Sequence, residues 1–522
     1  MKRIQEIAKS SFWQLAVIYS LLILVIALGF LGKYTIHFEI FAIILALLGI
    51  SLLFFNKESK EKDSKVNRNL HIGLFILALL IIVSFRTIPY INNSIPIGYD
   101  TGLYKYAIEH GLQNKDNWVI MGMEPGFLYL MKALSFIPSS FLLTYGFIFF
   151  CLLLGIAIYF FTRKYFGENE ALIALLLYAA STVQYQVFTY MYYRNIIGLS
   201  LMLFAFFFLK PSYNFLKSDY KYSRWLFIIL SGILAGIHRP TFYILGLSYF
   251  AYAFISPIQN KKYNLKILVK NILSGIMILI IASLFYLGTF KPALNILSPV
   301  ISSFTEPGNS PGTFISFFQY QFSTLAYLPL AILGFFFLIK RKQFNILFFW
   351  TLINAAIVYF QFFFFNRFII HLDIALIILA SLGASLLIKE KKKLGIALLI
   401  VLLASSFIMT FQLALNTKPL ISQPELQAIE SLQGQGFAMS ISSQYSPWLQ
   451  GYSNMKVIAP GMFDYDKWNK EQWNTFWAST NQTEIKQLMS QYQKPIYLFA
   501  GNRNFEKPCF TKLNEYIYNY TC

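Results

Sequence analysis

Charged residues are scarce in this chain. Only 13% of its 522 residues are Asp, Glu, Lys or Arg, whereas 57% are hydrophobic and the mean hydropathy is +0.55. Soluble globular proteins have about 25% charged residues. The chain therefore cannot cover its apolar surface in water, and its composition predicts a polytopic membrane protein.

Acidic residues are rarer than basic ones, 23 against 43, which gives a formal net charge of +20. A basic excess can indicate a nucleic-acid partner. Here the Lys and Arg residues form short clusters between hydrophobic runs, which is typical of the topology signals of membrane proteins. We therefore expect the lipid bilayer to be a partner and nucleic acid not to be one.

Motifs for nucleotide binding are missing as well. The sequence has no GxGxxG and no P-loop. The segments expected on the inner side of the membrane are too short for a nucleotide-binding domain, whose βαβ units need about 30 residues each. Any chemistry is therefore expected on the outer face, where nucleotide-activated substrates are not available.

Cysteine is rare, and its three residues show no metal-binding spacing such as CxxC. Cys151 lies in an apolar run and is expected to serve packing. Cys509 and Cys522 lie close together in the polar C-terminal tail, which is expected outside. Because the outer compartment is oxidising, we expect these two residues to form a disulfide.

Thirteen hydrophobic runs are candidates for membrane-spanning helices, since such a span needs about 20 apolar residues. A helical bundle satisfies its backbone groups within each helix, and the runs lack the alternating pattern of a membrane barrel. The runs cover residues 13–32, 36–55, 70–86, 141–161, 171–188, 196–209, 225–238, 240–256, 271–289, 322–339, 344–364, 368–388 and 394–415.

The basic clusters set the expected orientation. With the N-terminus inside, every inner segment is basic, including 57–68 and 389–393. The predicted domains are a transmembrane bundle over 1–415, with a first large outer loop at 87–140, and an extracytoplasmic α/β domain over 416–522. The expected location is the cytoplasmic (plasma) membrane, with the C-terminal domain outside.

The C-terminal tail has its own pattern of short elements. The segments QPELQAIESLQ and EIKQLMSQY are amphipathic and predict helices, while FAMSIS and KPIYLFAG predict strands. The tail is also dense in Trp and Tyr. These aromatic residues suit the core of a small domain or a membrane interface better than a sugar-stacking surface.

The segment Ile95–Met131 is a polar interruption between membrane spans and is the expected place for chemistry. It carries Asp100, Glu109, His110 and Glu124 among aromatic residues. Two interpretations of Asp100 stay open on the residues alone. It precedes a short amphipathic pattern and so suits a helix N-cap, or its carboxylate is a general base.

The spacing of these residues carries a family resemblance. Asp100 is followed by Tyr104, and Glu124-Pro125 leads into Leu128-Tyr129-Leu130. This pattern resembles the first outer loop of the GT-C superfamily, the polytopic glycosyltransferases that use polyprenyl-phosphate sugars. It is similar in particular to the dolichyl- or undecaprenyl-phosphate mannosyl- and aminoarabinose-transferase group. The resemblance implies a many-span bundle with a large first outer loop and a C-terminal outer domain.

The resemblance also implies a reaction. A sugar would pass from a polyprenyl-phosphate donor to a glycan, lipid or protein acceptor by an inverting single displacement. Asp100 would be the general base and Glu124 a second catalytic residue, while Tyr104, Glu109 and His110 would orient the acceptor. The donor is the only small molecule implied, and the sequence gives no support for a divalent metal.

A departing phosphate needs cationic groups near the outer membrane surface. Arg194, Arg239 and Arg367 each lie at the expected outer end of a span, and His238 and His371 lie next to or one turn from two of them. We interpret these five residues as a donor phosphate-binding group. Interfacial snorkelling is the alternative for each arginine, and a structural role in the bundle is the alternative for His371.

Two other functions are alternatives to a glycosyltransferase of this type. An O-antigen or exopolysaccharide polymerase or ligase also uses outer arginines and a lipid-linked donor, but its main functional loop is expected later in the chain. A lipid-linked glycan transporter or flippase should show repeated halves and acidic residues in the membrane interior. The sequence shows no repeat, and its acidic residues cluster in one loop.

The orientation makes a direct prediction. Single cysteines introduced at 98–120 or 416–522 should react with a membrane-impermeant maleimide added from outside. Cysteines at 57–68 or 389–393 should not react, because these segments are expected inside. Labelling of 57–68 from outside would reverse the predicted orientation.

Overall fold

The computed structural model describes residues 14–20, 68–113, 118–209, 221–259, 262–287, 314–362, 364–458 and 468–522. The chain divides into two compact units. We call residues 1–88, 148–187 and 193–416 the helical unit, and residues 89–147, 188–192 and 417–522 the loop-and-tail unit. The predicted spans at 13–32 and 36–55 lie wholly or mostly outside the described residues.

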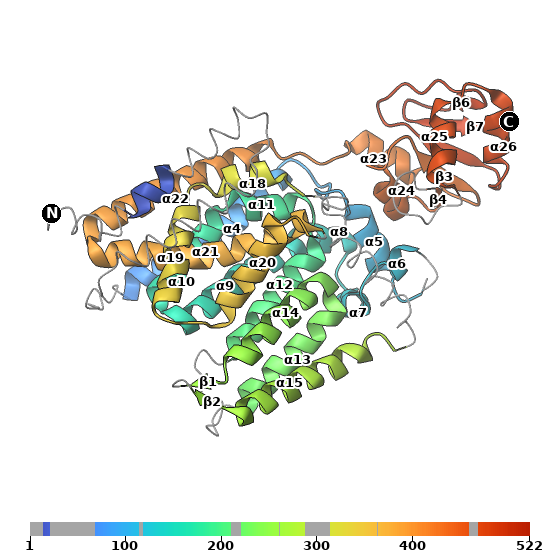
Figure 1. The fold of residues 1–522 in the computed structure, drawn as a ribbon. Helices are drawn as coiled ribbons and strands as arrows, with labels where there is room; N and C mark the ends of the chain where they lie inside the picture. The colour runs from blue at the N-terminus through green and yellow to red at the C-terminus, as the bar shows by residue number, and fades with distance from the viewer. Residues whose placement is uncertain are drawn as a thin grey trace. The chain divides into compact units, whose positions relative to one another are not determined.

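The helical unit consists of apolar helices with one short hairpin (Figure 1). Its elements are α4 (Arg68–Thr87), α9 (Phe147–Phe166), α10 (Glu168–Ala180), α11 (Thr182–Thr189), α12 (Tyr193–Phe208), α13 (Lys221–Ile237), α14 (Arg239–Ile255), β1 (Ile258–Gln259), β2 (Lys262–Tyr263), α15 (Leu265–Leu284), α18 (Phe317–Thr324), α19 (Leu328–Lys340), α20 (Ile346–Tyr359), α21 (Phe365–Glu390) and α22 (Lys392–Asn416).

Helix α21 lies at the centre of the helical unit. It is buried along almost its whole length and packs against α10, α19, α20 and α22. A helix that is apolar on all sides has to be covered by other helices. The closest approach is to α19, where a Cβ at Gly334 would lie 2.0 Å from the carbonyl oxygen of Leu379 and one at Gly383 would lie 2.1 Å from that of Leu330. Glycine at these positions lets the two backbones touch.

Among the described residues, five helices are long and apolar enough to cross a membrane, or up to seven if each of two bent helix pairs forms one span. The bent pairs are α10 with α11, at 52°, and α18 with α19, at 81°. Helices lie at all the predicted runs from 70–86 onward. The mostly helical fold with several apolar helices is therefore confirmed, whereas the count of thirteen spans is not, because several helices are too short to span alone.

The loop-and-tail unit combines the first large loop with the C-terminal tail. The loop forms η1 (Ile88–Tyr90), α5 (Thr101–His110), α6 (Trp118–Met121), α7 (Pro125–Ala133), α8 (Ser139–Phe141) and η2 (Leu142–Gly146). The tail forms α23 (Gln423–Glu430), β3 (Phe437–Ser440), α24 (Ser446–Tyr452), β4 (Lys456–Ile458), α25 (Lys470–Ala478), α26 (Gln482–Met489), β5 (Ile496–Phe499), β6 (Phe510–Lys512) and β7 (Ile517–Tyr520).

The tail contains a five-stranded mixed sheet in the order β4-β3-β5-β7-β6. Strand β3 is parallel to β4 and β5, while β7 is antiparallel to β5 and β6. The predicted helices correspond to α23 and α26, and the predicted strands to β3 and β5. The prediction of a small α/β tail is confirmed, although it did not include α24, α25, β4, β6 or β7.

Two hydrophobic clusters cover the opposite faces of this sheet, because neighbouring strand residues point to opposite sides. Ala438 and Phe499 face the cluster with α23 and α24, while Met439 and Leu498 face the cluster with α25 and α26. Ile95 from the first loop is buried in the first of these clusters. The loop therefore supplies part of the hydrophobic core of the tail.

Helix α5 of the loop packs against α24 of the tail through glycine. A Cβ at Gly102 would lie 1.8 Å from the carbonyl oxygen of Pro447, and one at Gly451 would lie 2.5 Å from the Cα of Gly102. Lys105 crosses the same contact, since its Nζ donates to the carbonyl of Gly451 at 3.0 Å and lies 4.8 Å from the centroid of the Tyr452 ring. These contacts join two segments more than 300 residues apart in sequence.

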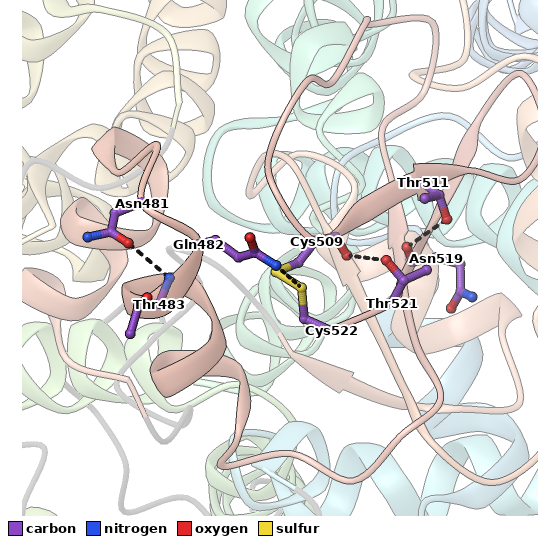
Figure 2. Close-up of a disulfide and its surroundings, with 8 residues drawn as sticks. All are labelled: Asn481, Gln482, Thr483, Cys509, Thr511, Asn519, Thr521 and Cys522. Atoms are coloured by element: carbon purple, nitrogen blue, oxygen red, sulfur yellow. Dashed lines mark hydrogen bonds between the residues drawn. A yellow bond between two sulfur atoms is a disulfide. The ribbon is translucent and has the colours of Figure 1, made fainter.

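The tail contains a disulfide between Cys509 and Cys522, at the edge of the sheet (Figure 2). The hydroxyl of Thr521 donates to the carbonyl of Cys509 at 3.2 Å, and the side-chain amide of Gln482 donates to the sulfur of Cys522 at 3.2 Å. The third cysteine, Cys151, is free and buried in the helical unit.

The glycine contact between α5 and α24 can be tested by a single methyl group. Gly102→Ala should destabilise the packing of the two helices by about 1–3 kcal/mol, the usual cost of overpacking, because Pro447 offers only rigid backbone to the new Cβ. Gly73→Ala on α4 is the matched control, since a Cβ there meets nothing within 4 Å. Hydrogen exchange of α5 and α24 should rise only in the first variant. Equal exchange in both variants would contradict the contact.

Candidate active site

Asp100 occupies the N-cap position of α5, but its side chain does not cap the helix. Its φ and ψ are −81° and 5°, its backbone carbonyl accepts from the backbone N–H of Tyr104 at 3.0 Å, and its carboxylate makes no capping hydrogen bond. A capping carboxylate would accept from the second or third backbone N–H of the helix. Capping therefore does not explain the carboxylate of Asp100.

The turn before α5 is held by the residues around Asp100. The hydroxyl of Thr101 is fully buried and donates to the carbonyls of Ile97, at 3.1 Å, and Gly98, at 2.9 Å. Gly98 has φ +110°, and a Cβ there would lie 2.4 Å from the Cβ of Met191, which itself has φ 57°. Only glycine suits this position. The segment before Asp100 is thus packed against the turn that precedes α12.

Tyr99 fixes the same turn to the tail. Its hydroxyl donates to the carbonyl of Ser443 at 2.9 Å. Burial, and to a smaller extent the negative charge of Asp100, raises the pKa of Tyr99 above its ordinary value, against the opposing effect of the bond to Ser443. Tyr99 therefore keeps its proton at neutral pH and remains a hydrogen-bond donor.

Glu124 is buried, with 2% of its surface exposed, and occupies the N-cap position of α7 with Pro125 as the first helical residue. Tyr104 of α5 meets Phe127 of α7 edge to face at 5.7 Å, so α5 and α7 pack together. The sequence placed Glu124 at the entry to the next span. Helix α7 has only nine residues, too few to cross a bilayer, and the next long apolar helical segment begins at Ser139.

Glu109 and His110 end α5, whereas Asp100 precedes it, so about 15 Å of helix separates them. Glu109 accepts from the Nζ of Lys105 at 2.8 Å and from the hydroxyl of Ser139 at 2.6 Å. The ring of His110 stacks on that of Tyr106 with centroids 4.8 Å apart. The structure does not bring these two side chains next to Asp100.

Arg194, Arg239 and Arg367 share one structural feature, because each lies in the first turn of a helix: α12, α14 and α21 respectively. All three are half-buried. A helix N-terminus carries a partial positive charge, so basic side chains are favoured at the other end. An anionic ligand at such a place would be attracted both by the helix dipole and by the guanidinium group.

The N-terminal turns of these helices meet at a buried cluster. His238 Nδ1 lies 2.7 Å from the hydroxyl of Thr241, and that hydroxyl lies 3.2 Å from Nε2 of His371. We call these three residues the imidazole cluster. Gly198 of α12 borders the cluster, since a Cβ there would lie 2.9 Å from the Cβ of His238. The cluster therefore links α12, α14 and α21.

The three arginines lie close to this cluster along their helices. Arg194 is four residues before Gly198, Arg239 directly follows the first histidine of the cluster, and Arg367 is four residues before the second. Residues four apart lie on the same face of a helix. The contacts of the imidazole cluster thus bring the arginine-bearing faces of α12 and α21 toward the start of α14, which carries Arg239.

A second polar group is buried where the two bent helix pairs meet α21. Asp373 is fully buried, and its Oδ2 accepts from the side chains of Gln184, at 2.7 Å, and Ser181, at 3.3 Å. Its Oδ1 accepts from the hydroxyl of Tyr327. Ser181 lies at the break between α10 and α11, and Tyr327 at the break between α18 and α19. Asp373 therefore braces both breaks.

Neighbouring residues complete this polar group. Thr410 of α22 donates to the carbonyl of Ala180, the last residue of α10, at 2.7 Å. Arg86 is buried and donates to the carbonyls of Ile82, at 3.2 Å, and Gln184, at 3.3 Å. A break in an apolar helix frees backbone groups that have to be satisfied inside the protein, and these side chains satisfy them.

Sequence reasoning gave Asp373 no defined role, and it missed Thr241 and Gln184 entirely. The expectation that acidic residues cluster in one loop was incomplete, because Asp373 lies inside an apolar helix. An acid in such a run is itself a signal. Nothing in the sequence marks Thr241, because its contact with His371 depends on how α14 and α21 lie against each other.

The described residues contain no group of three or more His, Cys, Asp or Glu side chains that could hold a metal ion. Thr101 stands beside Asp100, and its hydroxyl is committed to two backbone carbonyls. The residues around Asp100 therefore do not form a metal-binding donor set in the described part of the chain.

Comparison with known proteins shows what the chain resembles. Residues 124–286 match the model of the family described as dolichyl-phosphate-mannose-protein mannosyltransferase. A search of curated protein sequences found no match to the chain. The matched segment and the likeness of fold confirm the predicted resemblance to membrane glycosyltransferases of the GT-C type.

Two solved structures show the likeness of fold. One is the archaeal oligosaccharyltransferase AglB from Archaeoglobus fulgidus in complex with an inhibitory peptide and a dolichol-phosphate, with a TM-score of 0.60 and 14% identity over 83% of this chain and 69% of that chain. The other is ArnT from Cupriavidus metallidurans bound to undecaprenyl phosphate, with a TM-score of 0.56 and 10% identity over 83% of this chain and 93% of that chain.

The brace around Asp373 makes a stability prediction. Asp373→Ala removes the acceptor of the buried Tyr327 hydroxyl and the nearer of two acceptors of the Gln184 side-chain amide, which keeps the carbonyl of Ile370 at 3.4 Å. A buried donor left unsatisfied costs about 1–3 kcal/mol. The apparent melting temperature of the full chain in detergent should fall by several degrees. Ser381→Ala is the matched control, because in the described part of the chain its buried hydroxyl bonds only the carbonyl of Ile378 in the same helix. Equal melting temperatures for the two variants would show that Asp373 is not a brace.

Proposed function

We propose that this protein is an inverting membrane glycosyltransferase that transfers a sugar from a polyprenyl-phosphate donor to an acceptor on the outer face of the membrane. The observation that carries the proposal is the placement of three arginines in the first turns of α12, α14 and α21, around the imidazole cluster. The GT-C fold supplies the class of reaction, and this arrangement supplies a place for the phosphate.

The identity of the anion follows from its surroundings. The helical unit exposes large apolar side chains on its outer helices, such as Leu80, Leu279 and Ile400, so a ligand with a long hydrocarbon chain can lie beside it. The two solved structures of similar fold hold a dolichol-phosphate and undecaprenyl phosphate. A lipid phosphate therefore suits this site better than a soluble anion. Arg194, Arg239 and Arg367 are assigned to it, with His238 and His371.

The acceptor side of the reaction is assigned to Asp100 and Glu124. The acceptor atom attacks the anomeric carbon, the bond from that carbon to the phosphate oxygen breaks, and its electron pair stays on the phosphate. The proton of the acceptor atom passes to the carboxylate of Asp100. A single displacement inverts the anomeric centre. Tyr104 orients the acceptor, while Glu109 and His110 act from the far end of α5.

The acceptor class that merits testing first is a protein. The matching family is described as a protein mannosyltransferase, and the AglB structure contains a peptide. A glycan or lipid acceptor is the alternative. A transporter would use the buried Asp373 for coupling, but the hydrogen bonds of its carboxylate with Ser181, Gln184 and Tyr327 support a bracing role at the helix breaks.

Variants of the proposed base and variants of the proposed phosphate-binding residues should affect different quantities, turnover in the first case and donor binding in the second. Asp100→Asn keeps the size of the side chain and its helix-capping capacity but cannot take a proton, so turnover should fall by about 10²–10⁴ with donor binding nearly unchanged. Arg239→Ala and Arg367→Ala should instead weaken donor binding about tenfold at low salt, and less at high salt. The measurement is donor affinity and sugar transfer in nanodiscs, side by side.

The control for the arginine variants is Arg163→Ala. Arg163 ends α9 and pairs with Glu168, away from the three helix N-termini. This variant should leave donor affinity unchanged. Sugar transfer at the parental rate by Asp100→Asn would show that Asp100 is not the base. Equal donor affinity in the Arg163, Arg239 and Arg367 variants would contradict the assignment of the phosphate site.

A further inference from the structure

The imidazole cluster contains a hydrogen-bond chain with a direction. The hydroxyl of Thr241 lies between Nδ1 of His238, at 2.7 Å, and Nε2 of His371, at 3.2 Å. Thr241 and His371 are fully buried, and His238 is half-buried at the N-cap position of α14. Among the residues that the structure describes, this hydroxyl has no hydrogen-bond partner other than the two imidazoles.

A hydroxyl group has one proton, and this limits the arrangements. If Thr241 donated to neither imidazole, its buried proton would have no acceptor among the described residues, which is unfavourable. It therefore donates to one histidine and accepts from the other. Donation to His238 leaves the proton of His238 on Nε2, whereas donation to His371 requires the proton of His238 to be on Nδ1.

Two observations select the first arrangement. An O–H donor makes shorter hydrogen bonds than an N–H donor, so the 2.7 Å contact to His238 suits donation by Thr241 and the 3.2 Å contact suits donation by His371. In addition, Nδ1 of His371 is buried and has no hydrogen-bond partner among the residues that the structure describes. A bare nitrogen there is less costly than an orphaned buried N–H, which is rare in proteins.

We propose that Thr241 is a positioning residue that fixes His238 as the neutral tautomer with its proton on Nε2. His238 then presents a neutral N–H donor, beside Arg239, for an anionic oxygen of the lipid phosphate. Thr241 does not touch the ligand and acts through His238. This inference rests on the proposed function for the identity of the ligand, but the tautomer itself does not depend on it.

The backbone of α12 contributes to the same arrangement. A Cβ at Gly198 would lie 2.9 Å from the Cβ of His238 and 3.4 Å from the hydroxyl of Thr241. Neither the Cβ of His238 nor the short side chain of Thr241 can swing away as the end of a long side chain would. Glycine at 198 therefore lets His238 stand where Thr241 can reach it.

The tautomer can be measured without any assay of activity. The chain has only five histidines, so ¹⁵N-histidine labelling of the full chain in nanodiscs gives few imidazole signals, and His238→Asn identifies those of His238. We expect a protonated Nε2 and an unprotonated Nδ1 in the parent and in Thr241→Ser, and a mixture of tautomers in Thr241→Val. A proton on Nδ1 of His238 in the parent would overturn the proposal.

The consequence for binding is measured with undecaprenyl phosphate as the probe. Thr241→Val, which keeps the shape but loses the hydroxyl, should bind it about tenfold more weakly, and Thr241→Ser should bind within twofold of the parent. Thr351→Val is the matched control and should bind normally. Among the described residues, the buried hydroxyl of Thr351 bonds only the carbonyl of Leu347 in its own helix. Equal weakening by Thr241→Val and Thr241→Ser would indicate lost packing and overturn the positioning role.

Failure of this inference and failure of the proposed function give different results. If Arg239→Ala weakens binding of undecaprenyl phosphate and Thr241→Val does not, the phosphate site stands and the role of Thr241 is wrong. If neither variant changes the affinity while the tautomer is as proposed, the phosphate assignment is wrong and Thr241 serves another ligand or none, which also overturns its role in donor binding.

Discussion

Polar groups inside a bundle of apolar helices have to find their partners within the protein, and this constraint decides the arrangement of the helical unit. The breaks in the α10–α11 and α18–α19 pairs free donors and carbonyls among apolar side chains. Asp373 accepts from both breaks, including the side chains of Gln184 and Tyr327. The helix that carries it, α21, also carries Arg367 and His371. The helix that braces the breaks thus also presents part of the candidate phosphate site.

The fold was predictable where the signal is local. Long hydrophobic runs predicted the apolar helices. The hydrophobic periodicity and the composition of short segments predicted α23, β3, β5 and α26. The sequence divided the chain at residue 416, whereas the compact units group residues 89–147 with the tail. That grouping depends on Ile95 in the tail core and on the contact of Gly102 with Gly451. No local sequence pattern predicts these two long-range contacts.

The candidate site shows the same division. Residue type and expected topology singled out the arginines and histidines, because charge in an apolar chain is conspicuous. A local rule would have made Asp100 a helix cap, since an Asp before an amphipathic pattern usually is one, yet its carboxylate makes no capping bond. The role of Thr241 could not be predicted, because a threonine on a helix acquires two imidazole partners only through the packing of that helix.

The combination of three cations with a neutral imidazole suits the charge change of the proposed reaction. The phosphate of a sugar-linked donor is a diester with one negative charge, whereas the released lipid phosphate is a monoester with about −1.5 to −2 at neutral pH. Cationic groups therefore stabilise the departing phosphate more than the bound donor, which lowers the barrier. A fourth positive charge on His238 would strengthen product binding further and slow release. A neutral N–H held by Thr241 adds a hydrogen bond to the phosphate without adding that charge.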